Sequence, residues 1–251
     1  MLSTERKILL LNRLKRDGTI HVKEIANELK ISETTIRRDL VELEEEKKLT
    51  RVYGGAVRIG LDAILTEDKE VAMNDRMHIN FDTKTMLCQK ASELVKDGEC
   101  IFLDGGTTIV PMIDYLAKRK IKIVTHNHLI MEKLVNPTAE IIFIGGLYNA
   151  KYQMSEGPSA QNALKMFNFD RAFIGCAGVD LKNETAYTAE MQTREIKMIA
   201  MANSNHSYLL IDESKLNVKG FCLLSSTSIF DSVFVHMEEN AELPENFINV
   251  E

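Results

Sequence analysis

The sequence is poor in the residues and runs that mark special classes of protein. It has four prolines and four cysteines in 251 residues, and its longest aliphatic or aromatic runs are about four residues. A membrane-spanning helix needs about 20 apolar residues, so none is expected. With 45% hydrophobic and 27% charged residues, the composition is that of an ordinary globular protein and excludes a disordered, collagen-like or disulfide-scaffold chain. The N-terminus has no signal-peptide pattern, so we expect a cytoplasmic protein.

The cysteines and the charge add two further observations. Cys88, Cys100, Cys176 and Cys222 have no metal-binding spacing and lie among apolar neighbours, so we expect reduced core thiols. The net charge of −6 divides unevenly, because residues 1–60 carry +3 and the remainder carries −9. A basic N-terminal part on an acidic body indicates that only this part meets a polyanion.

The N-terminal part has the pattern of a helix-turn-helix. Ser32 is a favourable N-cap, and a short extended piece, residues 19–22, separates the first two helical segments. In a helix-turn-helix the second helix of the motif lies in the major groove, and its N-terminal residues contact base edges. Helices are expected over residues 3–18, 23–30 and 33–46.

Side chains that can bind DNA gather at the start of the third helix and in the segment after it. Threonine can contact bases, and arginine can bind guanine or phosphate. Residues 49–59 read as two short strands around Gly54-Gly55, which predicts a hairpin wing that can contact phosphate or the minor groove. The candidate DNA-binding residues are Ser32, Thr34, Thr35, Arg37, Arg38, Arg51 and Arg58.

Residues 32–56, SETTIRRDLVELEEEKKLTRVYGGA, resemble the signature of the DeoR-type winged helix-turn-helix. The resemblance rests on the ordered Ser, Thr, Ile, Arg, Arg, Asp and Leu of residues 32–40 and on the Gly-Gly-Ala of the wing. It implies an operator-binding domain over residues 1–59, with Asp39 as a structural partner and not a base reader. It also implies a linker over residues 60–81, and the Arg, Asn and Lys that the family repeats at four-residue steps fall on Arg76, Asn80 and Lys84.

Residues 82–251 alternate between strand-like and helical segments. Apolar runs end in polar or glycine-rich loops, and helical segments follow several of them. This alternation predicts an α/β domain with a largely parallel sheet, in which ligands bind outside the carboxyl ends of the strands. Strands are expected over residues 100–103, 122–125, 141–144, 171–175, 208–211, 221–224 and 232–235. Helices are expected over residues 82–96, where Asp82 is the cap, and over 109–120, 126–135 and 188–203.

The loop Asp104-Gly-Gly-Thr-Thr108 is the most specific feature of this part. Glycines admit close backbone approach, and the helix N-terminus and two hydroxyls favour a phosphate. Asp104 repels phosphate, so we expect it to accept hydrogen bonds from sugar hydroxyls or to orient the loop. The loop is neither a Walker A motif nor GxGxxG, so nucleotide binding is not expected. A strand-to-helix turn without a ligand is the alternative.

Residues 76–236 resemble the DeoR-type effector domain, whose fold is similar to ribose-5-phosphate isomerase and the CoA transferases. The resemblance implies a sugar-phosphate site that includes the Asp-x-Ser-Lys of residues 212–215 and the Gly-x-x-Gly of residues 175–178. The family has Thr-Asn where this chain has Thr125-His126, with Asn127 one residue later, and this departure bears on ligand preference. The candidate effector-binding residues are Asp104, Gly105, Gly106, Thr107, Thr108, Thr125, His126, Asn127, Gly145, Gly146, Gly175 and Lys215.

These observations predict a DNA-binding transcription regulator with a small winged helix-turn-helix domain and a larger α/β domain over residues 82–251. We expect a repressor of carbohydrate catabolism or transport genes. Its partners are operator double-stranded DNA, a phosphorylated sugar effector and further copies of itself, as a dimer or tetramer. No membrane, metal or cofactor is expected, since His126-x-His128 has no acidic or cysteine partner nearby in sequence.

The alternative hypothesis is a sugar-phosphate isomerase-like enzyme that carries a DNA-binding head. Such chemistry needs a positioned general acid and base. The candidates are Asp104, Glu190, Asp212 and Lys215, and no spacing makes them a catalytic set. A serine hydrolase is not supported, because the GxSxG motif is missing from the sequence.

Overall fold

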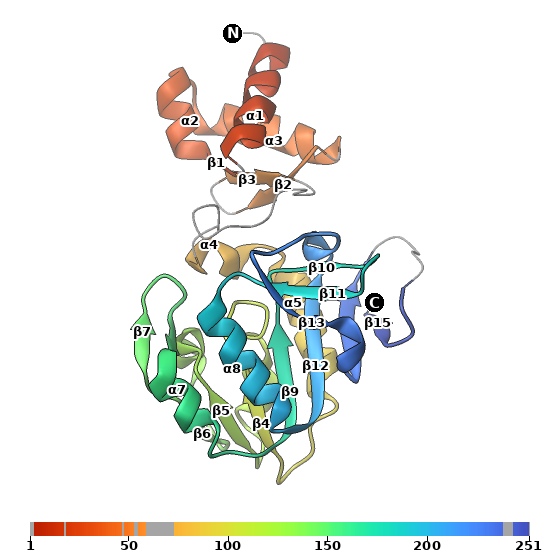
Figure 1. Cartoon of the computed structure of the whole chain (residues 1–251). Helices are drawn as coiled ribbons and strands as arrows, with labels where there is room; N and C mark the ends of the chain where they lie inside the picture. Colours follow the sequence, from red (N-terminus) through yellow and green to blue (C-terminus); the bar gives the residue numbers. More distant parts are fainter. Residues whose placement is uncertain are drawn as a thin grey trace. The chain divides into compact units, whose positions relative to one another are not determined.

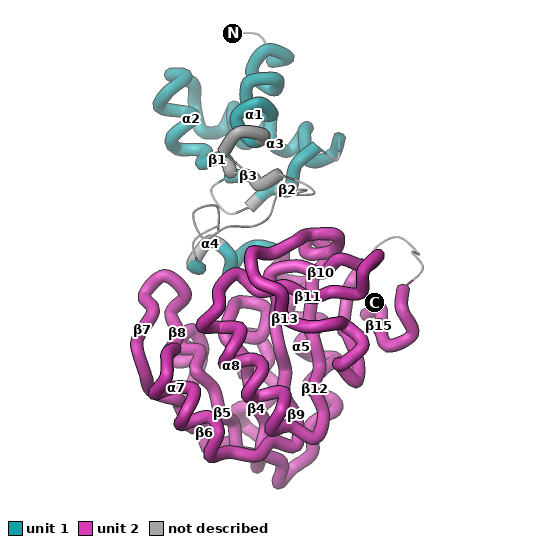
Figure 2. Tube along the Cα trace, in the orientation of Figure 1, with its two compact units in different colours: residues 1–61, 68–79 teal, residues 62–67, 80–251 magenta. Residues whose placement is uncertain are grey.

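The chain folds into two compact units, each with its own hydrophobic core. The computed structural model describes residues 3–17, 19–46, 48–52, 55–58, 73–237 and 243–250. One unit comprises residues 1–61 and 68–79, and the other comprises residues 62–67 and 80–251 (Figure 2). Gly18, Gly54 and most of the predicted linker, residues 60–72, lie outside the described residues. The domain limits at residues 59 and 81 therefore stay predictions.

The smaller unit is a helix-turn-helix followed by a β-hairpin (Figure 1). Its strands form an antiparallel sheet in the order β1-β3-β2. Leu10 and Leu14 of the first helix pack with Ile36, Leu40 and Leu43 of the third, and each is at most 1% exposed. The elements are α1 Ser3–Asp17, β1 Thr19–His21, α2 Val22–Leu29, α3 Glu33–Glu45, β2 Leu49–Val52, β3 Gly55–Arg58 and, after the undescribed stretch, α4 Met73–His78.

Local sequence explains how the helix-turn-helix forms. Lys30 ends α2 in the left-handed conformation, with φ 55°. Ser32 is extended, and its hydroxyl accepts a hydrogen bond from the Thr35 N–H at 3.2 Å, as expected of an N-cap. In the hairpin, a Cβ on Gly55 would lie 1.8 Å from the Ile20 carbonyl oxygen, so only glycine fits there. The predicted helices and wing strands are confirmed to within a few residues.

The larger unit is built on a parallel sheet with the strand order β15-β14-β12-β9-β4-β5-β6. In Figure 1, α7 and α8 lie in front of this sheet and α5 lies behind it. The strands are β4 Cys100–Leu103, β5 Lys122–Thr125, β6 Glu140–Phe143, β9 Phe169–Gly175, β12 Ser204–Asp212, β14 Ser232–His236 and β15 Phe247–Asn249. The α-helices are α5 Phe81–Ser92, α6 Met112–Leu116, α7 Gly157–Leu164 and α8 Met191–Ala202.

Smaller elements complete this unit. A hairpin, β7–β8, follows β6, and an antiparallel sheet has the order β10-β11-β13. Short 3-10 helices follow the ends of β5, β12 and β13. These elements are β7 Leu147–Asn149, β8 Met154–Glu156, β10 Gly178–Asp180, β11 Thr185–Thr188, β13 Cys222–Ser226, η2 His128–Lys133, η3 Glu213–Lys215 and η4 Thr227–Ile229.

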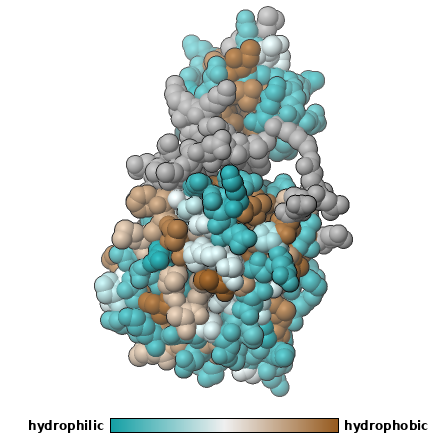
Figure 3. Space-filling view, turned by 45° about the vertical axis from the view of Figure 1, so that its right-hand side comes forward, coloured by the Kyte–Doolittle hydropathy of each residue, from teal (hydrophilic) through white to brown (hydrophobic). Residues whose placement is uncertain are grey.

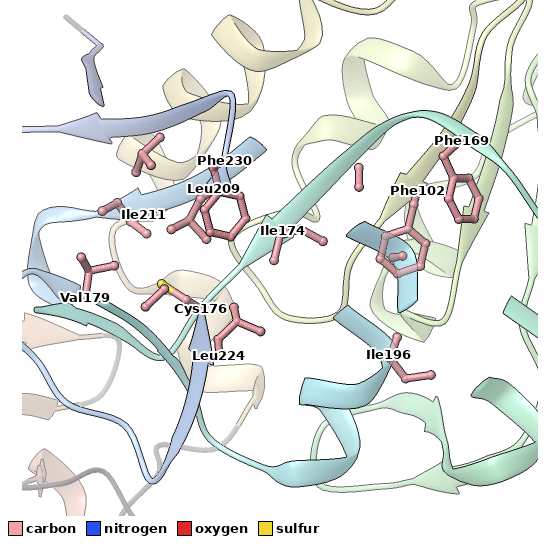
Figure 4. Close-up of a cluster of buried hydrophobic side chains, with 14 of the residues drawn as sticks. Phe102, Phe169, Ile174, Cys176, Val179, Ile196, Leu209, Ile211, Leu224 and Phe230 are labelled. Atoms are coloured by element: carbon pink, nitrogen blue, oxygen red, sulfur yellow. The ribbon is translucent and has the colours of Figure 1, made fainter. Parts of the chain in front are cut away.

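The main core lies between the parallel sheet and α8. Figure 4 shows Phe102, Ile174 and Leu209 of the sheet with Ile196 of the helix, and all four are fully buried. Burying a side chain of this size stabilises a fold by about 1.5–3 kcal/mol. The β strands that present these side chains end at the edge where the candidate effector loops begin, so the core fixes the positions of those loops.

The structure corrects several sequence-based expectations. Asp82 does not cap α5, because the helix begins at Phe81 after Asn80. Residues 126–135 do not form an α-helix but the short 3-10 helix η2, and α6 is shorter than predicted. The predicted strand at residues 221–224 belongs to the antiparallel sheet as β13 and not to the parallel one. Neither the β7–β8 hairpin nor α7 was predicted.

The visible surface of the larger unit is a mosaic of hydrophilic and hydrophobic residues (Figure 3). Leu147, Met166 and Phe221 are among its exposed apolar side chains. Across the described part of the chain, no helix has the length and apolar character needed to cross a membrane.

Candidate functional site

The start of α3 presents arginine side chains to solvent. The Arg37 side chain is 56% exposed and the Arg38 side chain is 82% exposed. Each is near a glutamate of the same helix: Arg37 Nη2 lies 3.2 Å from Glu33 Oε2, and Arg38 Nε lies 3.4 Å from Glu42 Oε1. Exposed pairs at this spacing contribute about 0.3–0.5 kcal/mol, so DNA phosphate can replace the glutamates at small cost.

Other polar residues of α3 support the helix itself. Asp39 is 2% exposed and accepts hydrogen bonds from Arg6 of α1, including one from Nη2 at 2.8 Å. This contact confirms the prediction that Asp39 is a structural partner. Ser32 Oγ caps the helix and lies 2.8 Å from Thr35 Oγ1, whereas Thr34 is exposed.

The wing carries two of the candidate DNA-binding arginines, Arg51 and Arg58. Arg51 of β2 is tied to α3, because its Nε lies 2.6 Å from Glu44 Oε2 and its backbone N–H donates to Glu44 Oε1 at 2.8 Å. Arg58 is the last residue of β3, and its side chain lies outside the described part of the chain. Glu44, which bonds to β2 of the wing through Arg51, therefore belongs to the same helix as the candidate residues of α3.

In the larger unit, the predicted polar loops converge at one edge of the sheet. Strands β12, β9, β4 and β5 are neighbours and run parallel, so their carboxyl ends lie side by side. Asp212 is the last residue of β12, and the residues that directly follow β9, β4 and β5 are Cys176, Asp104 and His126. This is the edge at which parallel sheets bind ligands.

Asp104 lies at the centre of this edge and is fully buried. Its Oδ2 accepts a hydrogen bond from the Gly175 N–H at 2.9 Å and forms an ion pair with Lys197 of α8. Lys197 also donates to the Gly175 carbonyl oxygen at 3.1 Å. Burial alone raises the pKa of Asp104, but the Lys197 ammonium and the neighbouring His126 ring together hold the pKa below its ordinary value. Of the two expected roles for Asp104, these contacts favour the orientation of the loop.

His126 and Asn127 hold the same loop from the neighbouring strand. His126 is 1% exposed, and its Nε2 accepts a hydrogen bond from the Gly105 N–H at 2.9 Å while Nδ1 lies 2.9 Å from the Ser155 carbonyl oxygen. The same Nε2 also lies 3.4 Å from Asp104 Oδ1. Asn127 Nδ2 donates to the Asp104 and Gly106 carbonyl oxygens at 3.2 and 3.1 Å. The histidine that departs from the family pattern therefore binds the loop, and Asn127 binds it as well.

The backbone of the loop has one glycine in an unusual conformation. Gly106 has φ 95°, in the left-handed region that favours glycine. Within the described chain, the N–H groups of Gly106, Thr107 and Thr108 donate to no acceptor. A Cβ on Gly105 would lie 2.8 Å from Met154 Cε, so glycine is required there by packing.

Two further lysines reach the threonines of the loop. Lys84 of α5, which is 3% exposed, donates to Thr107 Oγ1 at 3.1 Å. Lys215 donates to Thr108 Oγ1 at 2.9 Å and lies 3.9 Å from Asp212 Oδ2. The pKa of buried Asp212, which burial alone would raise, is lowered chiefly by Lys215.

Three lysines, Lys84, Lys197 and Lys215, thus lie at this edge of the sheet. Asp104 is paired with Lys197, and Asp212 has contacts with Lys215, Ser214 and Asn80. Ammonium groups beside backbone N–H groups can bind an anion through charge-assisted hydrogen bonds.

The structure brings together most, but not all, of the predicted effector residues. Gly146 packs against the end of β8 and against α7, because a Cβ there would lie 2.6 Å from the Glu156 carbonyl oxygen and 2.9 Å from Ala160 Cβ, and Gly145 beside it is exposed. Thr125 is buried and donates to the Leu103 carbonyl oxygen at 2.7 Å, a contact between β5 and β4.

Sequence reasoning missed Lys197 and left Lys84 as a linker feature. Lys197 lies in the buried stripe of α8 with Thr193, Ile196 and Ala200. A lysine inside an apolar stripe is unusual, because a buried charge requires a partner. That spacing is the signal that could have identified it.

Two other features do not compete with this site. A cavity of about 320 Å³ lies at the amino ends of β9 and β12, the opposite edge of the sheet, and no lysine or arginine lines it. In the part of the chain that the structure describes, no three His, Cys, Asp or Glu side chains are grouped as metal ligands.

The chain is similar to known proteins over most of its length. The sequence profile of a "DeoR-like helix-turn-helix domain" matches residues 6–60, and that of a "DeoR C terminal sensor domain" matches residues 79–236. An uncharacterised HTH-type transcriptional regulator FruR of Bacillus subtilis (strain 168) is 32% identical over 88% of this chain and 86% of its own length.

Two relatives have named functions. A lactose phosphotransferase system repressor of Lactococcus lactis subsp. lactis is 33% identical, over 83% of this chain and 81% of the relative. An L-fucose operon activator of Haemophilus influenzae is 30% identical, over 96% and 93%. Among solved structures, ribose-5-phosphate isomerase A of Methanocaldococcus jannaschii has a TM-score of 0.40 and 21% identity, over 55% of each chain.

Proposed function

The chain belongs to the DeoR family of DNA-binding transcription regulators, and we propose that it represses sugar-utilisation genes until a phosphorylated sugar binds its larger unit. Residues 1–59 bind operator DNA, and the loops around Asp104 to Thr108 bind the effector. The relatives named for lactose transport and the L-fucose operon support a role in carbohydrate metabolism. A protein with this role works in the cytoplasm, where the DNA is.

One observation carries the effector proposal. Lys84 and Lys215 approach the same loop from different elements, and each donates to one of its threonine hydroxyls. A phosphate placed between these ammonium groups and the N–H groups of residues 106–108 receives charge-assisted hydrogen bonds from several sides. An unphosphorylated sugar offers these donors only neutral hydroxyl oxygens, which accept weaker hydrogen bonds than a charged phosphate, so the phosphate supplies most of the affinity.

The contacts of the acidic residues favour a sensor over an isomerase. Asp104 is held by Lys197 and by the Gly175 N–H, and Asp212 is held by Asn80, Ser214 and Lys215. A general base must be able to reach a substrate proton, whereas these carboxylates are buried and already paired.

DNA recognition requires more than one copy of the chain. A single helix-turn-helix reads only a few base pairs, and dimers bind two half-sites about one helical turn apart. Specific affinities of about 10⁻⁸ M or tighter therefore depend on two heads. We propose that the larger unit supplies the contact, so residues 1–59 alone bind operator much more weakly than the full chain at equal salt.

Calorimetry with a panel of hexose phosphates and their unphosphorylated parents tests the effector proposal. A phosphorylated sugar should bind, and Lys215→Met should weaken its binding by about tenfold or more, since a hydrogen bond to a charged group contributes about 1.5–3 kcal/mol. Lys120→Met is the matched control, because Lys120 is an exposed lysine outside the loop contacts. Equal binding by phosphorylated and unphosphorylated sugars, or an unaffected Lys215→Met variant, contradicts the proposal.

The same variants can be followed on DNA in a gel-shift titration. The parent should leave the operator when the phosphorylated sugar is added, and Lys215→Met should remain bound. Gly106→Val is expected to block binding too, but its φ of 95° strains any side chain. Lys215→Met is therefore the cleaner test.

A further inference from the structure

Asn80 occupies an unusual position at the start of α5. Its backbone is left-handed, with φ 51° and ψ 40°, a conformation that asparagine tolerates better than most residues. Asparagine is also among the best N-cap residues, yet the Asn80 side chain makes no capping hydrogen bond. Its Nδ2 donates instead to Asp212 Oδ1 at 3.0 Å, across 132 residues of sequence.

Asp212 connects Asn80 to the candidate effector loop. This carboxylate also accepts from the Ser214 N–H at 3.2 Å and from the Ser214 hydroxyl. Its other oxygen lies 3.9 Å from Lys215 Nζ, and Lys215 donates to Thr108. Lys215 therefore contacts both Asp212 and the loop. An anion that attracts Lys215 weakens its interaction with Asp212, so the hydrogen bonds from Asn80 and Ser214 to Asp212 become stronger.

The first turn of α5 has a second contact with the same loop. Lys84 lies four residues after Asn80, so the two residues lie on the same side of the helix start. Lys84 Nζ donates to Thr107, and the Lys84 backbone N–H donates to the Asn80 carbonyl oxygen at 2.9 Å, which closes the first turn. The loop is thus connected to this turn at both of its threonines.

Asn80 is also the residue at which the chain passes from one unit to the other. Ile79 is the last residue of the DNA-binding unit, and Asn80 begins the continuous segment 80–251 of the larger unit. The conformation of Asn80 sets the direction in which the chain leaves α5. A change in the Asn80–Asp212 contact therefore acts where the connection to the DNA-binding unit begins.

We propose that Asn80 is a positioning residue that couples occupancy of the 104–108 loop to the order of the first turn of α5. The inference rests on the proposed anion site. A bound anion draws Lys215 toward the loop, strengthens the hydrogen bond from Asn80 to Asp212, and stabilises the turn that Lys84 closes. Asn80 itself does not contact the anion, so its removal uncouples the turn from the loop and, because coupling is reciprocal, lowers anion affinity by no more than the coupling factor.

Amide hydrogen exchange on the full chain tests this coupling, with inorganic phosphate as the probe and calorimetry as the measure of binding. In the parent, phosphate should slow exchange in residues 104–108 and also in residues 81–84, by about fivefold or more in each. Asn80→Gly keeps the left-handed backbone but removes the amide. Its phosphate affinity should be lower than the parent's by at most the factor by which phosphate slows exchange in residues 81–84 of the parent. It should protect residues 104–108 and lose the protection of residues 81–84.

Two further variants control for structural damage. Asn136→Gly makes the same change at another left-handed asparagine, with φ 45°, in an exposed position, and should behave like the parent. Asn80→Asp keeps the size but places a second carboxylate beside Asp212, and should also lose the protection of residues 81–84.

Each result is decisive. Protection of residues 81–84 that persists in Asn80→Gly overturns the inference. A loss of phosphate affinity in that variant that exceeds the parent's protection factor for residues 81–84 also overturns it, because Asn80 is then a binding contact. Protection confined to residues 104–108 in the parent overturns the coupling and leaves the anion site standing. No phosphate binding in the parent overturns the anion site and the coupling together.

Discussion

Replacing Lys197 should destabilise the larger unit more than any other single lysine change at the candidate effector site. Lys197→Met removes the ammonium from a carboxylate, Asp104, that is fully buried. Removing one partner of a buried ion pair costs about 3–5 kcal/mol, because the remaining charge has no compensation. For a domain of this size, about 2–4 °C is lost per kcal/mol, so the melting temperature should fall by roughly 6–20 °C.

The assay is thermal unfolding measured by calorimetry, in which the transition of the larger unit is resolved from that of the DNA-binding unit. Asp104→Asn in the Lys197→Met background is the informative control. The double variant has no uncompensated charge, so it should be more stable than Lys197→Met alone, although it carries one more substitution. Lys120→Met, an exposed lysine change, should leave the transition unchanged within about 0.5 kcal/mol.

The pKa of Asp104 predicts how the stability loss caused by Lys197→Met changes with pH. The pKa of Asp104 is lowered in the folded chain, so the stability it contributes is present above its ordinary value and is lost as pH falls through the lowered value. The loss in the free energy of unfolding caused by Lys197→Met should therefore become smaller as acid protonates Asp104. A loss below about 1 kcal/mol at neutral pH, or a double variant less stable than Lys197→Met, would refute the reasoning.

The remaining predictions concern DNA binding, the helix cap and a second carboxylate. Arg37→Ala should cost roughly 1–3 kcal/mol of operator affinity if Arg37 reads a base, and Arg38→Ala should lower the salt slope by about 1 if it contacts phosphate; gel shifts at several salt concentrations check both, and unchanged affinity in the double variant contradicts the assignment of α3. Ser32→Ala should cost the smaller unit about 1 kcal/mol in urea unfolding, whereas Thr34→Ala, at an exposed position, should not; equal stabilities would mean that the cap is unimportant. The pKa of Asp212 is lowered, so Asp212→Asn should flatten the loss of stability on acidification below about pH 4, and an unchanged pH profile contradicts that role.

The helix-turn-helix was predictable because its signals are local. The Ser32 cap, the apolar spacing of Ile36, Leu40 and Leu43, and the following hairpin all lie within about 30 residues. Each of these features depends on contacts between residues that are close together in the sequence. The edge of the parallel sheet was predictable for a related reason, since strand ends gather whatever the strand order is.

The ion pair at the centre of the candidate effector site was not predictable in the same way. Asp104 and Lys197 are 93 residues apart, and only the strand order β12-β9-β4 places α8 over the end of β4. The role of His126 was equally hidden, because its contact with Gly105 depends on the pairing of β4 with β5. The assumption of a helix over residues 126–135 also placed this histidine in the wrong kind of element.

The two sites hold their cations in opposite ways, and the difference suits their tasks. The arginines of α3 are exposed and, within the described residues, pair with glutamates of their own helix. A DNA backbone therefore exchanges with those partners readily and with a strong dependence on salt. The lysines around the 104–108 loop are buried or nearly so and are fixed by hydrogen bonds from three different elements. Because they are ordered before a ligand arrives, less side-chain entropy is lost on binding, and selectivity comes from the fixed positions of the donors. The exposed arginines of α3 thus suit a long polyanion, which they attract with low selectivity. The fixed lysines around the 104–108 loop suit one small anion that must be distinguished from many.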